Sequence, residues 1–250
     1  IFKEGNAVIA AKDASGTILW SWHIWLTDQP EEHVYRNNAG TMMDRNLGAT
    51  SATPGDIEAL GLLYQWGRKD PFLGSSSISQ SVRATSTLEW PQSISSGNIQ
   101  LSIENPTTFI CQSSGDEDWY VTSPRNDDRW MTSKTIYDPC PYGWRVPDGG
   151  NYGVWKTAGI TSIGSHPYDR SNEGILVKSP ASSPSTWYPA AGCRSYQDGT
   201  LDSVGTNGNF WSVTPRGDLY AYILYFGEAS LMPTLDTQRA FGLSVRCVKE

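Results

Sequence analysis

The chain has 250 residues and a formal charge of −7, and no run of Lys and Arg occurs in it. This charge pattern excludes nucleic acid, heparin-like polyanions and anionic membrane surfaces as main partners, since all of them need clustered basic residues. No stretch approaches the roughly 20 apolar residues of a membrane helix. The 11 Trp, 12 Tyr and 6 Phe predict a core built from large rings, and the 24 Gly and 15 Pro favour short strands.

The first predicted element is a hairpin near the N-terminus. Ala7–Ala10 and Ile18–Trp25 flank Asp13–Gly16, which has the composition of a turn. Rings and aliphatic side chains occur at both odd and even positions of the second run. Both faces of this strand are therefore expected to be covered. His23 lies within it and is interpreted as a hydrogen-bonded core or cleft histidine.

Two short segments with helical spacing follow. Apolar residues over 57–67 recur roughly at helical intervals and stop at Gly67, although a strand remains an alternative there. A second short helix is expected to start near Tyr152 and to include Trp155. Between the two segments, residues 68–135 contain few periodic runs, and loops of this length are usually functional or family-specific.

The last predicted elements are three β-rich runs, Gly208–Ser212, Ala221–Phe226 and Leu243–Val248. Each places apolar residues at alternate positions, and turn-forming residues separate them. We expect three neighbouring antiparallel strands.

These three runs, of which the last contains a cysteine, resemble the closing sheet of a C-type-lectin-like domain. The chain is similar to the Fibrobacter succinogenes major paralogous domain family and to the C-terminal domains of Bacteroidetes fimbrillin-type surface proteins. The earlier segments that carry the resemblance are, in the family's order, Met43–Gly48, Gly61–Trp66, Asp138–Pro147 and Tyr188–Gly192. The resemblance implies an α+β, C-type-lectin-like fold of mostly short antiparallel strands, with one or two short helices and long loops.

The resemblance also implies how the chain is organised and used. Compact lectin-like domains are about half this length, so residues 1–250 are expected to form one domain with an insertion at 68–135. The chain begins without Met or a signal peptide, which suggests a part excised from a larger exported protein. The implied role is non-enzymatic recognition or adhesion at the cell surface, attached to the outer membrane through another part. A glycan, a surface protein or other fimbrial subunits are the expected partners. A structural or assembly module of a surface fibre is the alternative.

Four cysteines, Cys111, Cys140, Cys193 and Cys247, allow three full pairings. None has metal-site spacing, and none has a histidine beside it. Cys140 and Cys247 lie in the two segments that match the family best, and the resemblance implies a disulfide between them. Four buried free thiols are the alternative.

The sequence favours no enzyme and no cofactor. It lacks a Gly-x-Ser-x-Gly elbow, a Walker loop, a GxGxxG turn and an HExxH motif. The formylglycine-generating enzymes have a related lectin-like core and use a late cysteine pair. Cys193 and Cys247 match that pair by position only, and the surrounding residues differ.

An acidic segment is one candidate site. Asp116, Asp118, Asp127 and Asp128 provide oxygen ligands of the kind that calcium prefers, with aromatic residues beside them. The spacing is not that of an EF-hand, and the Glu-Pro-Asn and Trp-Asn-Asp motifs of C-type lectins are absent. Calcium is therefore not favoured over a solvated acidic loop partly paired with arginine.

A second candidate lies before the closing strands and includes Trp187, Arg194, Tyr196 and Asp198. Lectin-like folds carry ligand loops in this region, and planar aromatic and polar groups suit sugar hydroxyls. The negative charge favours neutral or amine-bearing glycans over sulfated ones. In the alternative interpretation, Trp187 and Tyr196 only pack the loop onto the sheet.

Overall fold

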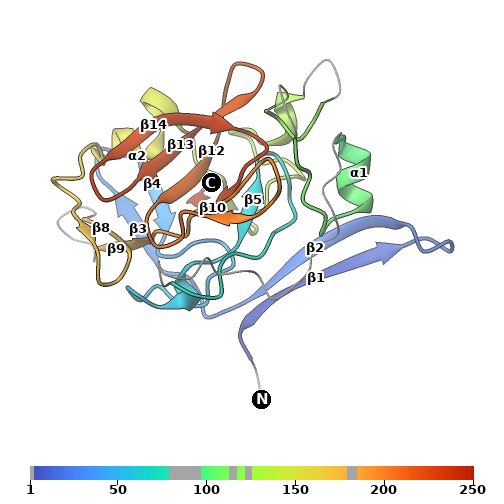
Figure 1. Cartoon of the computed structure of the whole chain (residues 1–250), viewed down its shortest axis with the longest axis horizontal. Helices are drawn as coiled ribbons and strands as arrows, with labels where there is room; N and C mark the ends of the chain where they lie inside the picture. Colours follow the sequence, from blue (N-terminus) through green and yellow to red (C-terminus); the bar gives the residue numbers. More distant parts are fainter. Residues whose placement is uncertain (1–2, 79–96, 113–116, 122–125, 179–184) are drawn as a thin grey trace.

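The computed structural model of the chain describes residues 3–78, 97–112, 117–121, 126–178 and 185–250. Strands account for 35% of the residues and helices for 9%, which agrees with the predicted α+β class. Figure 1 shows a body of short strands and loops, from which the N-terminal hairpin extends to one side. Within the described ranges, no helix is both long and apolar enough to cross a membrane.

The strands are β1 (Gly5–Lys12), β2 (Ile18–Leu26), β3 (Glu32–Tyr35), β4 (Gly40–Met43), β5 (Leu63–Gln65), β6 (Trp144–Arg145), β7 (Tyr168–Asp169), β8 (Gly174–Val177), β9 (Thr186–Pro189), β10 (Cys193–Arg194), β11 (Leu201–Asp202), β12 (Gly208–Arg216), β13 (Tyr220–Phe226), β14 (Leu231–Gln238), β15 (Gly242–Ser244) and β16 (Val248–Lys249). The helices are α1 (Ile99–Glu104) and α2 (Val154–Thr157), and the 3-10 turns are η1 (Ile57–Ala59), η2 (Asp127–Arg129) and η3 (Gly150–Tyr152).

The largest sheet runs in the order β11-β10-β15-β12-β13-β14, and β5 also pairs with β15. Neighbouring residues of β12 point to opposite faces, so Phe210 and Trp211 enter two different apolar clusters. Leu224 on β13 lies opposite Phe210, and Ile223 lies opposite Trp211. Each face of the sheet is therefore covered by its own core, which fixes the register of the strands.

The prediction for the closing strands is correct for one pair and wrong for the other. β12 and β13 are antiparallel neighbours, but β15 lies parallel to β12, with Phe210 opposite Ser244. The run Leu243–Val248 is not one strand, because β15 ends at Ser244 and β16 joins β4 and β6 in another sheet. The sequence analysis also missed β14, which contains Pro233. Proline is tolerated there because β14 is the edge strand of its sheet.

The disulfide between Cys140 and Cys247 is present, with Cα atoms 5.9 Å apart. Both cysteines lie in the apolar cluster that also contains Trp211. The bridge joins the segment before β6 to the segment before β16, at a sequence separation of 107 residues. It therefore ties the C-terminal end of the chain to the core, and the alternative of four free thiols is wrong.

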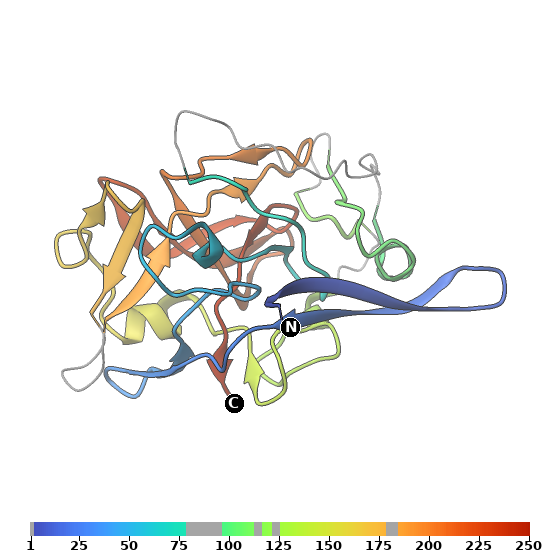
Figure 2. The same cartoon turned by 90° about the horizontal axis from the view of Figure 1, so that it is seen from below.

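The N-terminal hairpin is confirmed, but the expectation that both its faces are covered is wrong. β1 and β2 pair from Gly5 opposite Leu26 to Lys12 opposite Ile18 and form a separate two-stranded sheet. Figure 2 shows this ribbon extending beyond the body at its turn. Leu19 is 56% exposed and Trp22 is 47% exposed. We call β1 and β2 the ribbon.

The two helical expectations have different outcomes. Over 57–67 the chain forms only the short turn η1 and then β5, because Gly61 between them takes a left-handed backbone with φ of +70°. This conformation interrupts a helix, and the N–H of Leu62 donates instead to the carbonyl of Leu47. The second expectation is confirmed, since η3 and α2 lie where a short helix was predicted. The described part of 68–135 contributes the buried Trp119 and Trp130 to the core.

Candidate functional site

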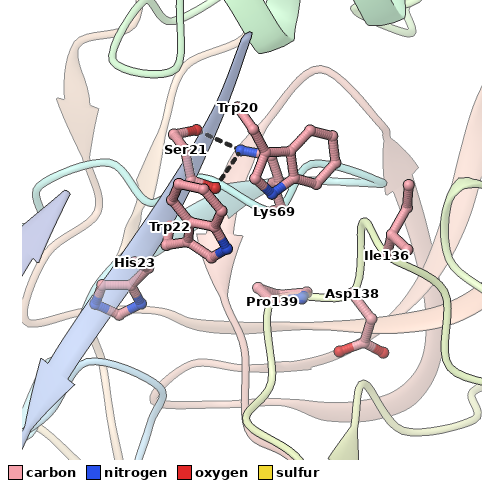
Figure 3. A pocket seen from close by; sticks show the side chains of 8 residues that line it. All are labelled: Trp20, Ser21, Trp22, His23, Lys69, Ile136, Asp138 and Pro139. Carbon is pink, nitrogen blue, oxygen red and sulfur yellow. Dashed lines mark hydrogen bonds between the residues drawn. The ribbon is translucent and has the colours of Figure 1, made fainter. Parts of the chain in front are cut away.

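A cleft of about 520 Å³ lies between the ribbon and the segment before β6. Its lining residues are Trp20, Ser21, Trp22, His23, Lys69, Ile136, Asp138 and Pro139. Figure 3 shows β2 crossing the cleft, with the indoles of Trp20 and Trp22 on the side that faces the loop of Ile136 and Pro139. We call it the ribbon cleft.

A chain of hydrogen bonds holds the ribbon to the body. The amide nitrogen of Asn6 donates to the carbonyl of Gly48 at 2.7 Å, so the amide oxygen of Asn6 faces Nε2 of His23 at 2.8 Å. His23 Nε2–H therefore donates to Asn6, and Nδ1 accepts from the Tyr64 hydroxyl at 3.2 Å. Burial lowers the pKa of His23 from 6.5 to about 4, which keeps the imidazole neutral. The interpretation of His23 as a hydrogen-bonded histidine is confirmed.

An ion pair closes one end of the ribbon cleft. Lys69 Nζ lies 2.7 Å from a carboxylate oxygen of Asp70 and donates to the carbonyl of Ser21 at 3.0 Å. The Ser21 hydroxyl donates to the same Asp70 oxygen at 2.6 Å. The Lys69 ammonium also lies 4.5 Å from the centroid of the Trp20 ring. Burial lowers the pKa of Lys69, and the charge of Asp70 opposes this shift.

The face of the ribbon that opens into the cleft is apolar. Residues opposite each other in an antiparallel pair share a face, so Ile9 accompanies Trp22 and Ala11 accompanies Trp20. Ile9 is 52% exposed. Among the described residues, neither the Trp20 nor the Trp22 indole N–H has a hydrogen-bond partner. The half-exposed ring of Trp22 is thus available to a ligand, whereas the Trp20 ring also packs against Tyr137, with ring centroids 6.0 Å apart.

The other polar groups of the cleft are already engaged. The Asp138 carboxylate accepts from Lys134 at 3.0 Å and from the backbone N–H groups of Cys140 and Val146, both at 2.9 Å. His23 and Lys69 also have protein partners, as described above. With its titratable groups bound internally, the cleft is suited to stacking and apolar contact rather than to proton transfer.

The residues predicted around Tyr196 do not form one surface. Trp187 is buried on β9, and buried Arg194 donates to the carbonyls of Leu73 and Gly199, where it holds a turn together. Tyr196 is half-buried and packs edge-on against Phe241, with ring centroids 4.9 Å apart. Asp198 is exposed, but its carboxylate accepts from the backbone and hydroxyl of the nearby Thr200.

This arrangement matches the alternative reading, in which the rings pack the loop onto the fold. Trp187 and Tyr196 also belong to different surroundings, because Trp187 lines a separate polar cleft and Tyr196 lies beside the cluster of Trp119.

Two carboxylates of the acidic candidate pair with arginine, as the alternative interpretation expected, although Asp118 is buried and not solvated. Buried Asp118 accepts from Arg129 at 3.1 and 2.5 Å and from Arg239 at 3.4 Å, and Asp127 also pairs with Arg239. Asp128 is exposed. Both guanidinium groups lie over the Trp66 ring, at 4.9 and 4.4 Å from its centroid. In the described ranges no cluster of three His, Cys, Asp or Glu could hold a metal, while Asp116 lies outside those ranges.

Sequence reasoning missed the ribbon cleft for an identifiable reason. Rings on both faces of β2 led to the expectation that both faces are covered, whereas Trp22 is 47% exposed although Ser21, His23 and Trp25 on the other face and Trp20 beside it contact the body. Ile136 and Pro139 come from a distant loop, and no sequence pattern links them to the hairpin. The available signal was Trp20 and Trp22 at i and i+2, which place two rings on one face.

Comparison of the chain with protein-family models, curated proteins and solved structures gave no match.

Proposed function

We propose that this chain is a non-enzymatic recognition or adhesion domain of the cell surface that binds carbohydrate in the ribbon cleft. The observation that carries the proposal is Trp22, whose ring is half-exposed and whose indole N–H has no partner among the described residues. Sugar rings stack their C–H faces on indoles and accept hydrogen bonds from N–H donors. Trp20 extends the same stacking surface.

The setting of the cleft supports this role. Lys69 and Asp70 form a rigid, neutral pair at its end, and Tyr64 and Asn6 hold the strand through His23. A surface whose supporting groups are already hydrogen-bonded loses little conformational entropy when a ligand binds. Such pre-organisation suits a weak, repeated contact with a surface glycan.

The proposed fold is C-type-lectin-like, and the proposed relatives are the fimbrillin-type surface proteins. The motifs that resemble the family occur in its order, and the Cys140–Cys247 disulfide that the resemblance implied is present. A disulfide also suits an oxidising, extracytoplasmic location.

A formylglycine-generating activity receives no support from the cysteines. Cys247 is bonded to Cys140, so it is not available as a partner of Cys193. Burial raises the pKa of the Cys193 thiol to about 12, which leaves it protonated and poorly nucleophilic at neutral pH.

A glycan array with the intact chain, with and without calcium, tests the proposal. We expect binding that does not need calcium and that Trp22→Ala weakens by about 1–2 kcal/mol, or about fivefold to thirtyfold. Tyr152→Ala is the matched control, because Tyr152 is 95% exposed but lies outside the cleft. Equal binding by both variants, or no glycan binding at all, would refute the proposed site.

An assembly module of a surface fibre is the second candidate, and one observation favours it. Within the described residues, β1 pairs only with β2, so its outer edge offers unpaired backbone groups to a strand from another subunit. Sedimentation velocity at increasing concentration separates the two functions. Association that grows with concentration, together with an absence of glycan binding, would favour assembly, whereas a monomer that binds glycans would favour recognition.

A further inference from the structure

A second cleft, of about 480 Å³, lies where the segments around 28–33, 44–54 and 185–187 meet. It shares no lining residue with the ribbon cleft. Its walls carry hydroxyl side chains from 50–53 and 185–186, together with Trp187. Unlike the ribbon cleft, it therefore presents many hydrogen-bonding groups and little apolar surface. We call it the polar cleft.

His33 is an unusual member of this cleft. The side chain is 4% exposed, and neither ring nitrogen has a hydrogen-bond partner. A buried polar group without a partner costs about 1–3 kcal/mol. Nε2 faces the Glu31 carboxylate at 3.7 Å, which is too long for a hydrogen bond. Glu31 is 71% exposed, so its carboxylate is open to solvent beside the buried imidazole.

The carboxylates of the cleft outnumber its cations. Asp44 is buried and binds Arg45 through both oxygens, each at 3.0 Å, and Arg45 also pairs with Asp28. This hydrogen bond from Arg45 lowers the pKa of Asp28, which keeps that carboxylate charged. The cleft thus contains three carboxylates and one guanidinium, and the Glu31 carboxylate accepts no hydrogen bond from the described residues. The cleft therefore favours a positive charge near Glu31 and His33.

The cation that fits this cleft is an organic ammonium and not a metal ion. No three His, Cys, Asp or Glu side chains of the described residues come close enough to hold a metal together. A primary ammonium needs fewer ligands and bonds to single acceptors at about 2.8–3.0 Å. One ammonium nitrogen can reach both the Glu31 carboxylate and Nε2 of His33, since these atoms are 3.7 Å apart. The surrounding hydroxyl groups suit a hydroxylated ligand.

We propose that the polar cleft binds an amino sugar, whose ammonium group bridges Glu31 and His33. The sugar hydroxyls bond to the accessible hydroxyl side chains of 50–53 and to Ser185. This site goes beyond the proposed function of the ribbon cleft and does not depend on it.

Titration calorimetry of the intact chain with D-glucosamine tests the proposal, with three matched probes. D-glucose lacks the charge, N-acetyl-D-glucosamine replaces it with an amide, and ethanolamine keeps the ammonium without the sugar ring. We expect glucosamine to bind at least tenfold more tightly than each of them. We also expect its affinity to fall as sodium chloride rises, because Glu31 is exposed to solvent. Equal affinity for glucosamine and glucose, or for glucosamine and ethanolamine, would overturn the proposal.

Glu31→Gln and Glu32→Gln form the matched pair of variants. Glu32 is the next residue, is also exposed, and pairs with Lys249 outside the cleft. Glu31→Gln should weaken glucosamine binding about threefold to tenfold, and Glu32→Gln should leave it unchanged. Trp22→Ala should also leave it unchanged, so failure of the ribbon cleft would be recognised separately. Equal affinity of the two glutamine variants contradicts the assignment of Glu31.

Discussion

The tryptophans of the body and those of the ribbon have different environments, although the residue type is the same. Five body tryptophans are fully buried, and each indole N–H donates to a carbonyl or hydroxyl oxygen. These residues are Trp66, Trp119, Trp130, Trp155 and Trp211. Trp20 and Trp22 of the ribbon donate to none of the described residues. Burial with a satisfied N–H indicates a structural role, whereas the half-exposed ring of Trp22 is the one that we propose to bind a ligand.

The same contrast occurs within the single strand β2. Trp25 lies on the face toward the body, and its indole N–H donates to the carbonyl of Ala49 at 3.0 Å. Trp22 lies on the opposite face and remains half-exposed. Strand alternation thus places one ring in the fold and the other at the surface, and the difference depends on which face of the ribbon contacts the body.

The comparison predicts a large difference in stability between two alanine substitutions. Trp211→Ala should lower the free energy of unfolding by about 3–5 kcal/mol, because it removes a buried ring and leaves a cavity in the sheet core. Trp22→Ala should lower it by less than about 1 kcal/mol, since half of the ring is already exposed. Guanidinium unfolding followed by circular dichroism measures both. Similar losses for the two variants would contradict the assigned roles.

The guanidinium groups of Arg129 and Arg239, which lie over the Trp66 ring, provide the second test. Asp118→Asn removes the carboxylate that pairs with Arg129 and Arg239, so among the described residues it leaves these two buried guanidinium groups with only the Asp127–Arg239 ion pair. We expect a loss of about 3 kcal/mol in the free energy of unfolding. Asp128→Asn is the control, because Asp128 is exposed and should have little effect. If calcium raised the melting temperature of the wild type but not of Asp118→Asn, the arginine assignment would be wrong.

The smallest effect concerns the attachment of the ribbon. Burial lowers the pKa of His23 from 6.5 to about 4, so between these pH values the unfolded chain binds the proton more tightly than the folded one. The stabilisation is complete above about pH 6.5 and is lost as the pH falls to about 4. Because His23 is only partly buried, we expect a loss of about 1–2 kcal/mol.

His23→Gln supplies the reference for this measurement, since glutamine does not titrate. The wild type should lose more stability than the variant between pH 7 and pH 4.5. Amide exchange should locate the change in β1 and β2, whose attachment His23 provides. If the free energy of unfolding changed equally with pH in the two proteins, His23 would not be the cause of the loss.

Local patterns in the sequence predicted the elements that depend on local physics. The turn at Asp13–Gly16 and the alternating run Ala221–Phe226 led to the observed hairpin and to the β12–β13 pair. The short helix near Tyr152 was also correct. The Cys140–Cys247 pairing came from the family resemblance and not from spacing, since four cysteines leave three pairings open.

The candidate sites were predicted less well, because a residue's type does not reveal its neighbours. Asp118 had the chemistry of a calcium ligand, but Arg129 donates to both of its oxygens, and Arg239, far along the chain, adds a longer contact to one of them. Arg194 and Trp187 had the chemistry of ligand contacts, yet both are buried in the fold. Each of these outcomes was decided by contacts between segments that are distant in sequence.

The sequence by itself determined the class of the fold, the turns, and the supply of rings and carboxylates. Only the tertiary structure decided which ring remains exposed and which carboxylate is already paired. Strand alternation defines two faces but does not identify the one that packs on the body, and β2 with its exposed Trp22 is the example. Likewise, Arg45 binds Asp44 and Asp28, whereas the side chains of His33 and Glu31 form no hydrogen bond to the described residues. Burial and partner geometry are properties of the folded chain, so they cannot be read from residue order alone.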